Sequence, residues 1–194
     1  MMVLALDQAP RTTGYCHGES VHGVTPVWGV KQFESYAENE ILLVRAYRTW
    51  LLTLCELVEP KVIYCEQIII DMQHVNLPVT YQQFAVVGAI IGVCEHLGID
   101  LYQVDIAKWR KRALGKNNKP KWAVDGQDNW LKEAAKLACA ERNWLIDDHN
   151  AAEAALIFDY GCAHCDTTYR AATQPHIERV LFERENRDRA FNGK

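Results

Sequence analysis

Two short apolar runs in this chain each end in a carboxylate. Val3–Leu6 is followed directly by Asp7, and the run KVIYCE at residues 61–66 ends at Glu66. Runs of this length, bounded by polar residues, are typical of strands that are buried on both faces. Because open α/β sheets bind ligands at the carboxyl ends of their strands, we expect both acids to lie in a crevice.

The remaining pattern predicts three further strands and four helices. The expected strands lie at 12–16, 27–33 and 99–104, and the expected helices at 38–59, 77–97, 128–142 and 151–163. The first three strands are close enough in sequence to form an antiparallel meander, and the later strands alternate with helices. This order predicts an α/β fold, a mixed five-stranded sheet with helices on both faces, which is the RNase H-like topology.

The composition changes beyond Asp166. We therefore predict one domain at 1–165 and a charged C-terminal tail at 166–194, in which 179–189 is either a helix packed on a partner or a mobile segment. The helix at 77–97 contains Gly88 and Gly92, four residues apart. Such spacing permits close approach of another helix, but packing under the sheet is the interpretation that we favour.

Composition narrows the class of protein. The chain has 194 residues, 49% of them hydrophobic, and seven cysteines scattered among apolar neighbours, which indicates buried thiols in a reducing cytoplasm. The longest near-continuous apolar run, Phe84–Cys94, is too short to span a bilayer, and the N-terminus has no signal-peptide pattern. We expect a cytoplasmic protein without a membrane partner.

The charge is unevenly distributed. The net charge is −4, yet the segment between Ile106 and Val124 contains seven basic residues and no acid. These residues are Lys108, Arg110, Lys111, Arg112, Lys116, Lys119 and Lys121. A basic patch on an acidic body is typical of a surface that binds nucleic-acid phosphates, although a solvated lysine-rich loop has the same pattern.

A third group of acids follows in the sequence DDHNAAE at 147–153. Asp148 is a candidate helix N-cap, and Asn150 and Glu153 are three residues apart and so share one helix face. Alone, each acid has an ordinary structural explanation as a turn, strand-end, cap or solvated helix residue. Together, Asp7, Glu66 and Glu153 form an oxygen-rich set of the kind that binds Mg²⁺ or Mn²⁺.

These motifs carry a family resemblance. The opening VLALDQAPRTTGYC and the later VIYCEQ resemble the first strand and the second acidic strand of RuvC-type Holliday junction resolvases, and DHNAAEAALIFDYG resembles the D-x-N-x-A-D-A motif of the phage and prophage branch. The resemblance covers about Met1–His164. Asp7 and Glu66 match the first two metal ligands of the family, and Glu153 stands where the family has Asp. Asn150 stands where the family has Asp or His, so the fourth ligand is open among Asn150, Asp148 and His149.

The resemblance implies a crossover junction endodeoxyribonuclease, a homodimer that cuts four-way DNA junctions by phosphodiester hydrolysis with two Mg²⁺ or Mn²⁺ ions. In that reading the catalytic residues are Asp7, Glu66, Asp148, Glu153 and Lys116. Ile69 lies in an apolar loop where the family has a residue that wedges into the junction, although a loop packed on the tail fits equally. The alternatives are a nuclease on other branched or hybrid nucleic acid, and an inactive binding module of the same fold.

Overall fold

The computed structural model describes residues 1–36, 38–68, 76–115 and 130–192, and these contain one five-stranded mixed sheet. Its strands are β1 (Met2–Asp7), β2 (Thr12–Glu19), β3 (Val27–Gln32), β4 (Val62–Glu66) and β5 (Asp100–Val104). Their order across the sheet is β3-β2-β1-β4-β5. The first three strands form an antiparallel meander, whereas β4 runs parallel to both β1 and β5. The predicted mixed five-stranded sheet is confirmed.

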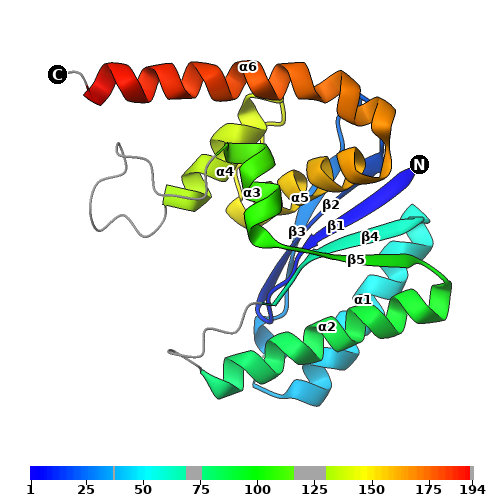
Figure 1. Ribbon diagram of the computed structural model, residues 1–194. Helices are drawn as coiled ribbons and strands as arrows, with labels where there is room; N and C mark the ends of the chain where they lie inside the picture. The colour runs from blue at the N-terminus through cyan, green and yellow to red at the C-terminus, as the bar shows by residue number, and fades with distance from the viewer. Residues whose placement is uncertain (37, 69–75, 116–129, 193–194) are drawn as a thin grey trace.

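Helices cover both faces of the sheet (Figure 1). On one face lie α1 (Glu40–Val58) and α2 (Leu77–Leu97), and on the other lie α3 (Ile106–Leu114), α4 (Trp130–Ala140), α5 (His149–Cys165) and α6 (Thr167–Asn192). A short 3₁₀ helix, Glu34–Tyr36, precedes α1.

The central strand β1 is buried on both faces. Leu4 and Leu6 belong to the core beneath α1 and α2, whereas Val3 and Ala5 belong to the core beneath α5, and all four are fully buried. This alternation follows from the two-residue period of a strand. Packing on both faces therefore fixes the position of the carboxyl end of β1, where Asp7 lies.

Helix α5 lies directly against the sheet because two glycines leave room for it. A Cβ atom on Gly14 of β2 would lie 2.0 Å from the Asn150 carbonyl oxygen at the start of α5. A Cβ atom on Gly161 of α5 would lie 2.6 Å from the ring of Tyr64 on β4. The first of these contacts places the amino end of α5 beside the carboxyl end of β1.

The helix α3 was not predicted. It begins after the N-cap Asp105, whose side chain accepts a 2.7 Å hydrogen bond from the Ala107 N–H, and it ends at Gly115, which has a positive φ of 76°. Within α3 the buried residues are Trp109 and Ala113, one turn apart. That narrow apolar stripe, surrounded by cations, is too weak a periodic signal to identify a helix of nine residues.

Residues 167–192 form one long helix, which extends well beyond the segment 179–189 that the charge pattern singled out. In Figure 1 α6 crosses above α3 and α4. Its first turn is capped by Asp166, which accepts hydrogen bonds from the Thr168 and Tyr169 N–H groups at 2.8 and 3.0 Å. The division of the chain at 165/166 into domain and tail stays a prediction.

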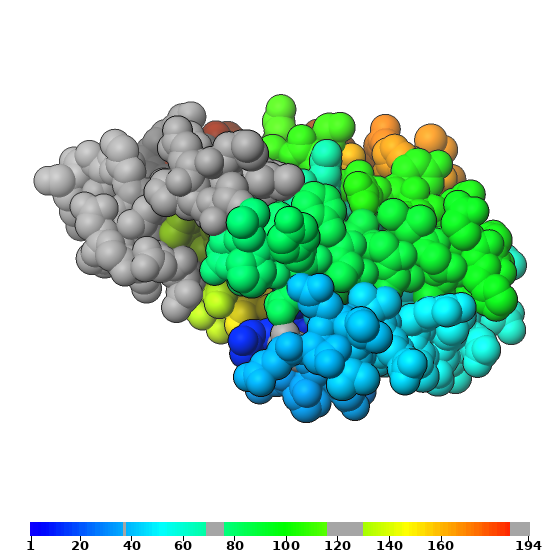
Figure 2. All heavy atoms as spheres, turned by 90° about the horizontal axis from the view of Figure 1, so that it is seen from below, coloured from blue at the N-terminus to red at the C-terminus, as the bar shows by residue number. Residues whose placement is uncertain are grey.

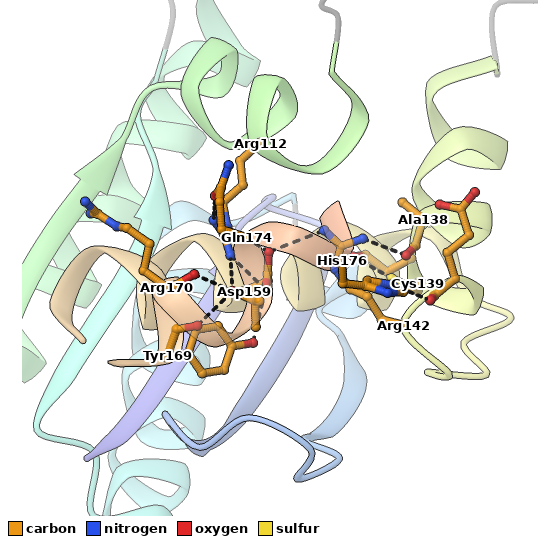
Figure 3. Close-up of polar contacts among 12 residues, drawn as sticks. Arg112, Ala138, Cys139, Arg142, Asp159, Tyr169, Arg170, Gln174 and His176 are labelled. Atoms are coloured by element: carbon orange, nitrogen blue, oxygen red, sulfur yellow. Dashed lines mark hydrogen bonds and ion pairs between the residues drawn. The ribbon is translucent and has the colours of Figure 1, made fainter. Parts of the chain in front are cut away.

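A buried ion network joins α6 to the other helices (Figure 3). Asp159 of α5 is 1% exposed and accepts hydrogen bonds from Arg112 Nε at 2.9 Å and from the Tyr169 hydroxyl at 3.0 Å. Arg142 Nη2 lies 3.4 Å from the same carboxylate. Burial opposes ionisation of Asp159, but the two guanidinium groups and the hydrogen bonds outweigh it and lower the pKa of this carboxyl.

Helix α2 differs from its expected role in two respects. By length and composition Leu77–Leu97 could cross a membrane, a finding that core helices of soluble proteins also give. Gly88 and Gly92 do not pack under the sheet as we expected: both are exposed, and a Cβ atom on either would meet nothing within 4 Å. The small-residue spacing therefore lies on the open side of the helix.

Candidate metal centre

Three carboxylates from distant parts of the chain meet at the carboxyl edge of the sheet. Asp7 ends β1, Glu66 ends the neighbouring parallel strand β4, and Glu153 lies in the second turn of α5. Each offers a carboxylate oxygen within 4.8 Å of the other two, and each side chain is partly buried. The predicted convergence of these three acids is thus present in the structure.

The two strand ends are tied together by Gln8. Its side-chain amide donates to the Glu66 carbonyl at 2.6 Å, and its carbonyl oxygen accepts from the Glu66 N–H at 3.0 Å. The amide of Gln8 therefore occupies both backbone groups of Glu66 and fixes the point at which the two carboxylates emerge. The sequence analysis did not identify this role of Gln8, since nothing local indicates a partner 58 residues away.

Trp109 of α3 orients the Glu66 carboxylate. Its indole N–H donates to Glu66 Oε1 at 2.7 Å, and the side chain is 1% exposed. The sequence analysis did not identify Trp109 as a donor to the acidic cluster. Finding it required knowing that residues 106–114 form a helix beside the end of β4.

Charge repulsion and burial act together on Asp7. Burial raises the pKa of its carboxyl well above the ordinary value, and the neighbouring Glu153 and Glu66 raise it further. The charge of Asp148 acts in the same direction, and among the described residues the charge of Arg110 opposes it. In the absence of a cation, the three acids cannot all be ionised without a substantial electrostatic cost.

The other two acids respond in the same way. Burial, followed by the charge of Glu153, raises the pKa of Glu66 to about 7, against the opposing effects of the Trp109 hydrogen bond and the Arg110 charge. Burial also raises the pKa of Glu153, although Arg110 and Lys132 partly offset it. A divalent cation between the carboxylates would remove this repulsion, so the donor set fits a hard, oxygen-binding ion.

Arg110 is a counter-charge to all three acids of the cluster. Its guanidinium carbon lies 5.2 Å from the centre of the Trp109 ring, and its charge lowers the pKa of all three acids. Its Nε is buried and has no hydrogen-bond partner among the described residues. Arg110 thus places an incompletely bonded cation next to the acids, where a phosphate would approach.

The start of α5 provides the remaining candidates. Asp148 is the N-cap: its Oδ1 accepts from the Asn150 and Ala151 N–H groups at 2.8 and 3.1 Å. Among the described acidic, histidine and cysteine residues, neither Asp148 nor His149 belongs to the three-carboxylate cluster. Asn150 shares its helix face with Glu153 and lies against Gly14. The fourth ligand therefore stays a prediction, open among the three.

The residues of the predicted basic patch lie in different environments in the structure. Arg110 faces the acidic cluster, and Lys108 and Lys111 are exposed on α3. Arg112 differs from these three: its side chain is 12% exposed and its Nε is bound to Asp159, so this guanidinium belongs to the buried network, and its contact with nucleic acid stays a prediction. Four further predicted residues lie outside the described part of the chain: Lys116, Lys119, Lys121 and Ile69.

Comparisons with known proteins identify the fold. No protein-family model and no curated protein matches the sequence. Two solved structures of Thermus thermophilus RuvC, one in complex with a Holliday junction substrate, each match with a TM-score of 0.60 and 16% identity over 81% of this chain and 90% of theirs. The yeast mitochondrial Holliday junction resolvase Ydc2 matches with 17% identity over 97% of this chain and 83% of its own, at a TM-score of 0.47. The chain shares the fold of RuvC.

Proposed function

We propose that this protein is a divalent-metal-dependent endonuclease that cuts four-way DNA junctions. The observation that carries the proposal is the meeting of Asp7, Glu66 and Glu153 within 4.8 Å at the carboxyl edge of the sheet. The fold adds support, because a protein of the same fold has been solved with a Holliday junction substrate. Carboxylate clusters in crevices of this kind suit phosphoryl chemistry more than the binding of an organic cofactor.

The metal would be held by the three carboxylates, with Asn150, Asp148 or His149 as a further ligand. Mg²⁺ or Mn²⁺ fits the all-oxygen donors, and two ions are proposed. When bound, such ions stabilise charge on a phosphodiester and clamp the attacking and leaving oxygens of an in-line displacement.

The chain's own residues prepare the site for an anionic substrate. Gln8 and Trp109 hold Glu66 in place, so its carboxylate does not reorganise when substrate arrives. Arg110 brings a positive charge to the edge of the cluster, where it can bind a non-bridging phosphate oxygen. The amino end of α5 adds the positive end of its dipole on the same side. We also propose that Lys116 contributes charge at the phosphate.

We further propose that the protein acts as a homodimer through the open face of α2. Figure 2 shows this face, on which α2 runs beside α1. Large apolar side chains are exposed along it, flanking Gly88 and Gly92: Leu77, Tyr81, Phe84 and Ile91. An exposed apolar stripe with small residues four apart permits two copies of the helix to approach closely across a twofold axis. A dimer would present two metal centres to one symmetric substrate.

Cleavage assays test the nuclease directly. We expect wild-type protein with Mg²⁺ or Mn²⁺ to cut a synthetic four-way junction at paired positions, and to cut linear duplex and an RNA–DNA hybrid at least about tenfold more slowly. Preferential cutting of the hybrid would favour the RNase H-like alternative. Binding without cutting of any substrate would leave the inactive module.

The dimer has its own test. Phe84→Asp should convert the protein to a monomer in sedimentation velocity, because it buries a charge in the proposed interface. The control is Leu145→Asp, which places the same charge at a residue that is 82% exposed on a loop before α5 and should leave the dimer intact. A monomeric wild type, or equal behaviour of both variants, would contradict the interface.

A further inference from the structure

A groove lies between α3, α5 and α6, three helices on the same face of the sheet. It has a volume of about 510 Å³ and is floored by Tyr160 and Ala163 of α5. One wall is the exposed side of α3 and the other is the first half of α6. The predicted basic patch includes the cations of one wall, but the groove itself was not predicted, because that wall belongs to a helix that the pattern did not predict and the other wall to the segment treated as a tail.

Among the described residues, the groove is lined by cations and by no acid. Lys108 and Lys111 lie on the α3 wall, and Arg170 lies on the α6 wall. Within the part of the chain that the structure describes, none of these three side chains forms an ion pair. The Nε of Arg170 donates to the Ala163 carbonyl at 2.8 Å, which holds its guanidinium at the rim. A phosphate entering the groove would meet three uncompensated positive charges.

The two walls are held at a fixed separation by the buried network (Figure 3). Arg112 of α3 donates through Nη2 to Thr173 Oγ1 at 2.8 Å and through Nη1 to Gln174 Oε1 at 3.3 Å, both on α6. At the far end, Leu181 of α6 lies so close to Gly115 that a Cβ atom there would be 2.7 Å from it. The groove is therefore built into the fold and does not depend on loose surface side chains alone.

The position of the groove relates it to the metal centre. On the nine-residue helix α3, Trp109 and Arg110 face the acidic cluster, whereas Lys108 and Lys111 face the groove. The two sites are thus separated by the width of one helix with its side chains, about 10–12 Å. Along duplex DNA this corresponds to about three nucleotide steps.

From this arrangement we propose that the α3–α6 groove binds backbone phosphates of a DNA arm about three nucleotides from the phosphate at the metal centre. The position of the groove along the DNA, relative to the cleaved phosphate, rests on the proposed nuclease function. The affinity of the groove for phosphate rests only on its own charges. Arg170, which the sequence did not single out, becomes a DNA-binding residue, and α6 becomes part of the substrate-binding surface.

The test compares two triple variants with the same change of charge. Lys108→Ala/Lys111→Ala/Arg170→Ala removes the three groove cations that form no ion pair among the described residues, and Arg45→Ala/Arg48→Ala/Lys61→Ala removes three exposed cations from α1 and from the residue before β4, outside the groove. Affinity for a short DNA duplex and for a four-way junction is measured across a series of salt concentrations. Thermal melts of both variants verify that they fold.

We expect the groove variant to reduce the slope of log K against log[salt] by about 2 to 3, because each lost phosphate contact lowers it by about 0.9. The control should keep the wild-type slope. Equal slopes in wild type and groove variant, or equal reductions in both triple variants, would overturn the proposal. Junction cleavage by wild type is measured in parallel. If wild type does not cut junctions but the groove variant still reduces the slope, the nuclease function is wrong and the groove proposal holds.

Discussion

Helix α5 carries two acids, Asp159 and Glu153, whose surroundings have opposite electrostatics. Asp159 of α5 is surrounded by Arg112, Arg142 and the Tyr169 hydroxyl, and its pKa is lowered. Glu153, two turns earlier on α5, lies against two other carboxylates with one incompletely bonded arginine nearby, and its pKa is raised. Asp159 is balanced by two guanidinium groups, whereas the positive charge beside Glu153 does not balance the cluster of three carboxylates. A buried acid that the fold satisfies is structural, and a buried cluster that the fold leaves unsatisfied indicates a site for a ligand.

The largest effect that separates the acidic cluster from the Asp159 network is expected in catalysis. Asp7→Asn should reduce junction cleavage at least about 10⁴-fold, equivalent to more than 5 kcal/mol, because it removes a carboxylate that holds the metal. The free energy of unfolding of the metal-free variant should not decrease, since one repelling charge is gone. Single-turnover cleavage and chemical denaturation measure the two quantities. Cleavage within tenfold of wild type would remove Asp7 from the site.

The second effect is on stability. Asp159→Asn should lower the free energy of unfolding by about 3–5 kcal/mol, because it leaves Arg112 and Arg142 buried without their carboxylate. Urea denaturation measures this loss, and Glu133→Gln, at an exposed ion pair on α4, serves as a control with a change below about 1 kcal/mol. Equal stability of Asp159→Asn and the control would show that the buried ion network does not hold α6 in place.

The acidic cluster and the Asp159 network should also respond to pH in opposite directions. Glu66 has a pKa of about 7 in the folded protein against 4.5 for an ordinary glutamate, so its contribution is present below pH 4.5 and is lost as the pH rises through 7. The loss is about 3 kcal/mol at most in metal-free protein. The lowered pKa of Asp159 acts in reverse: its stabilisation is present above pH 3.8 and is lost as the pH falls.

Denaturation of metal-free protein at a series of pH values tests this difference. Wild type should lose stability between pH 5 and pH 8, and Glu66→Gln should show a flatter profile over the same range. Saturating Mg²⁺ should restore much of the loss in wild type, because the cation takes over the neutralisation of the cluster. Identical profiles for wild type and Glu66→Gln would contradict the raised pKa.

The smallest expected effect is that of replacing Arg110, which is compared with replacing Arg112 on the same helix. Arg110→Met should lower the free energy of unfolding by only about 1 kcal/mol, because the acids lose an opposing charge but the buried Nε has no hydrogen-bond partner to lose among the described residues. Arg112→Met, two residues away, should cost about as much as Asp159→Asn. Thermal and chemical denaturation of the pair measures the difference. Equal destabilisation would show that Arg110 is structural and would remove it from the substrate side of the site.

The alternation of strands and helices could be predicted from the sequence because it is local. The short apolar runs that end in Asp7 and Glu66 predicted two buried strands, and the spacing of Asn150 and Glu153 placed Glu153 on a helix face. The structure has these elements, with β1 beside β4. The Gly88–Gly92 spacing was misassigned, because a helix pattern does not indicate which of its faces the sheet will cover.

The interactions between distant segments could not be predicted. Arg112 belongs to a run of cations that has the same appearance whether it faces solvent or a buried acid, and its partner Asp159 lies 47 residues away in an alanine-rich helix. The residue types of Gln8 and Trp109 occur both in turns and in cores, so they do not indicate what these side chains contact. Their contacts with Glu66 arise only when α3 and the two strands pack together.

The measurement that tests the central claim most directly is a titration of Mn²⁺ into metal-free protein, followed calorimetrically or by electron paramagnetic resonance. Wild type should bind Mn²⁺ saturably, Glu153→Gln should bind at least about tenfold more weakly, and the exposed control Glu133→Gln should match wild type. Equal Mn²⁺ affinity in all three proteins, or no saturable binding by wild type, would contradict the assignment of the acidic cluster as a metal centre.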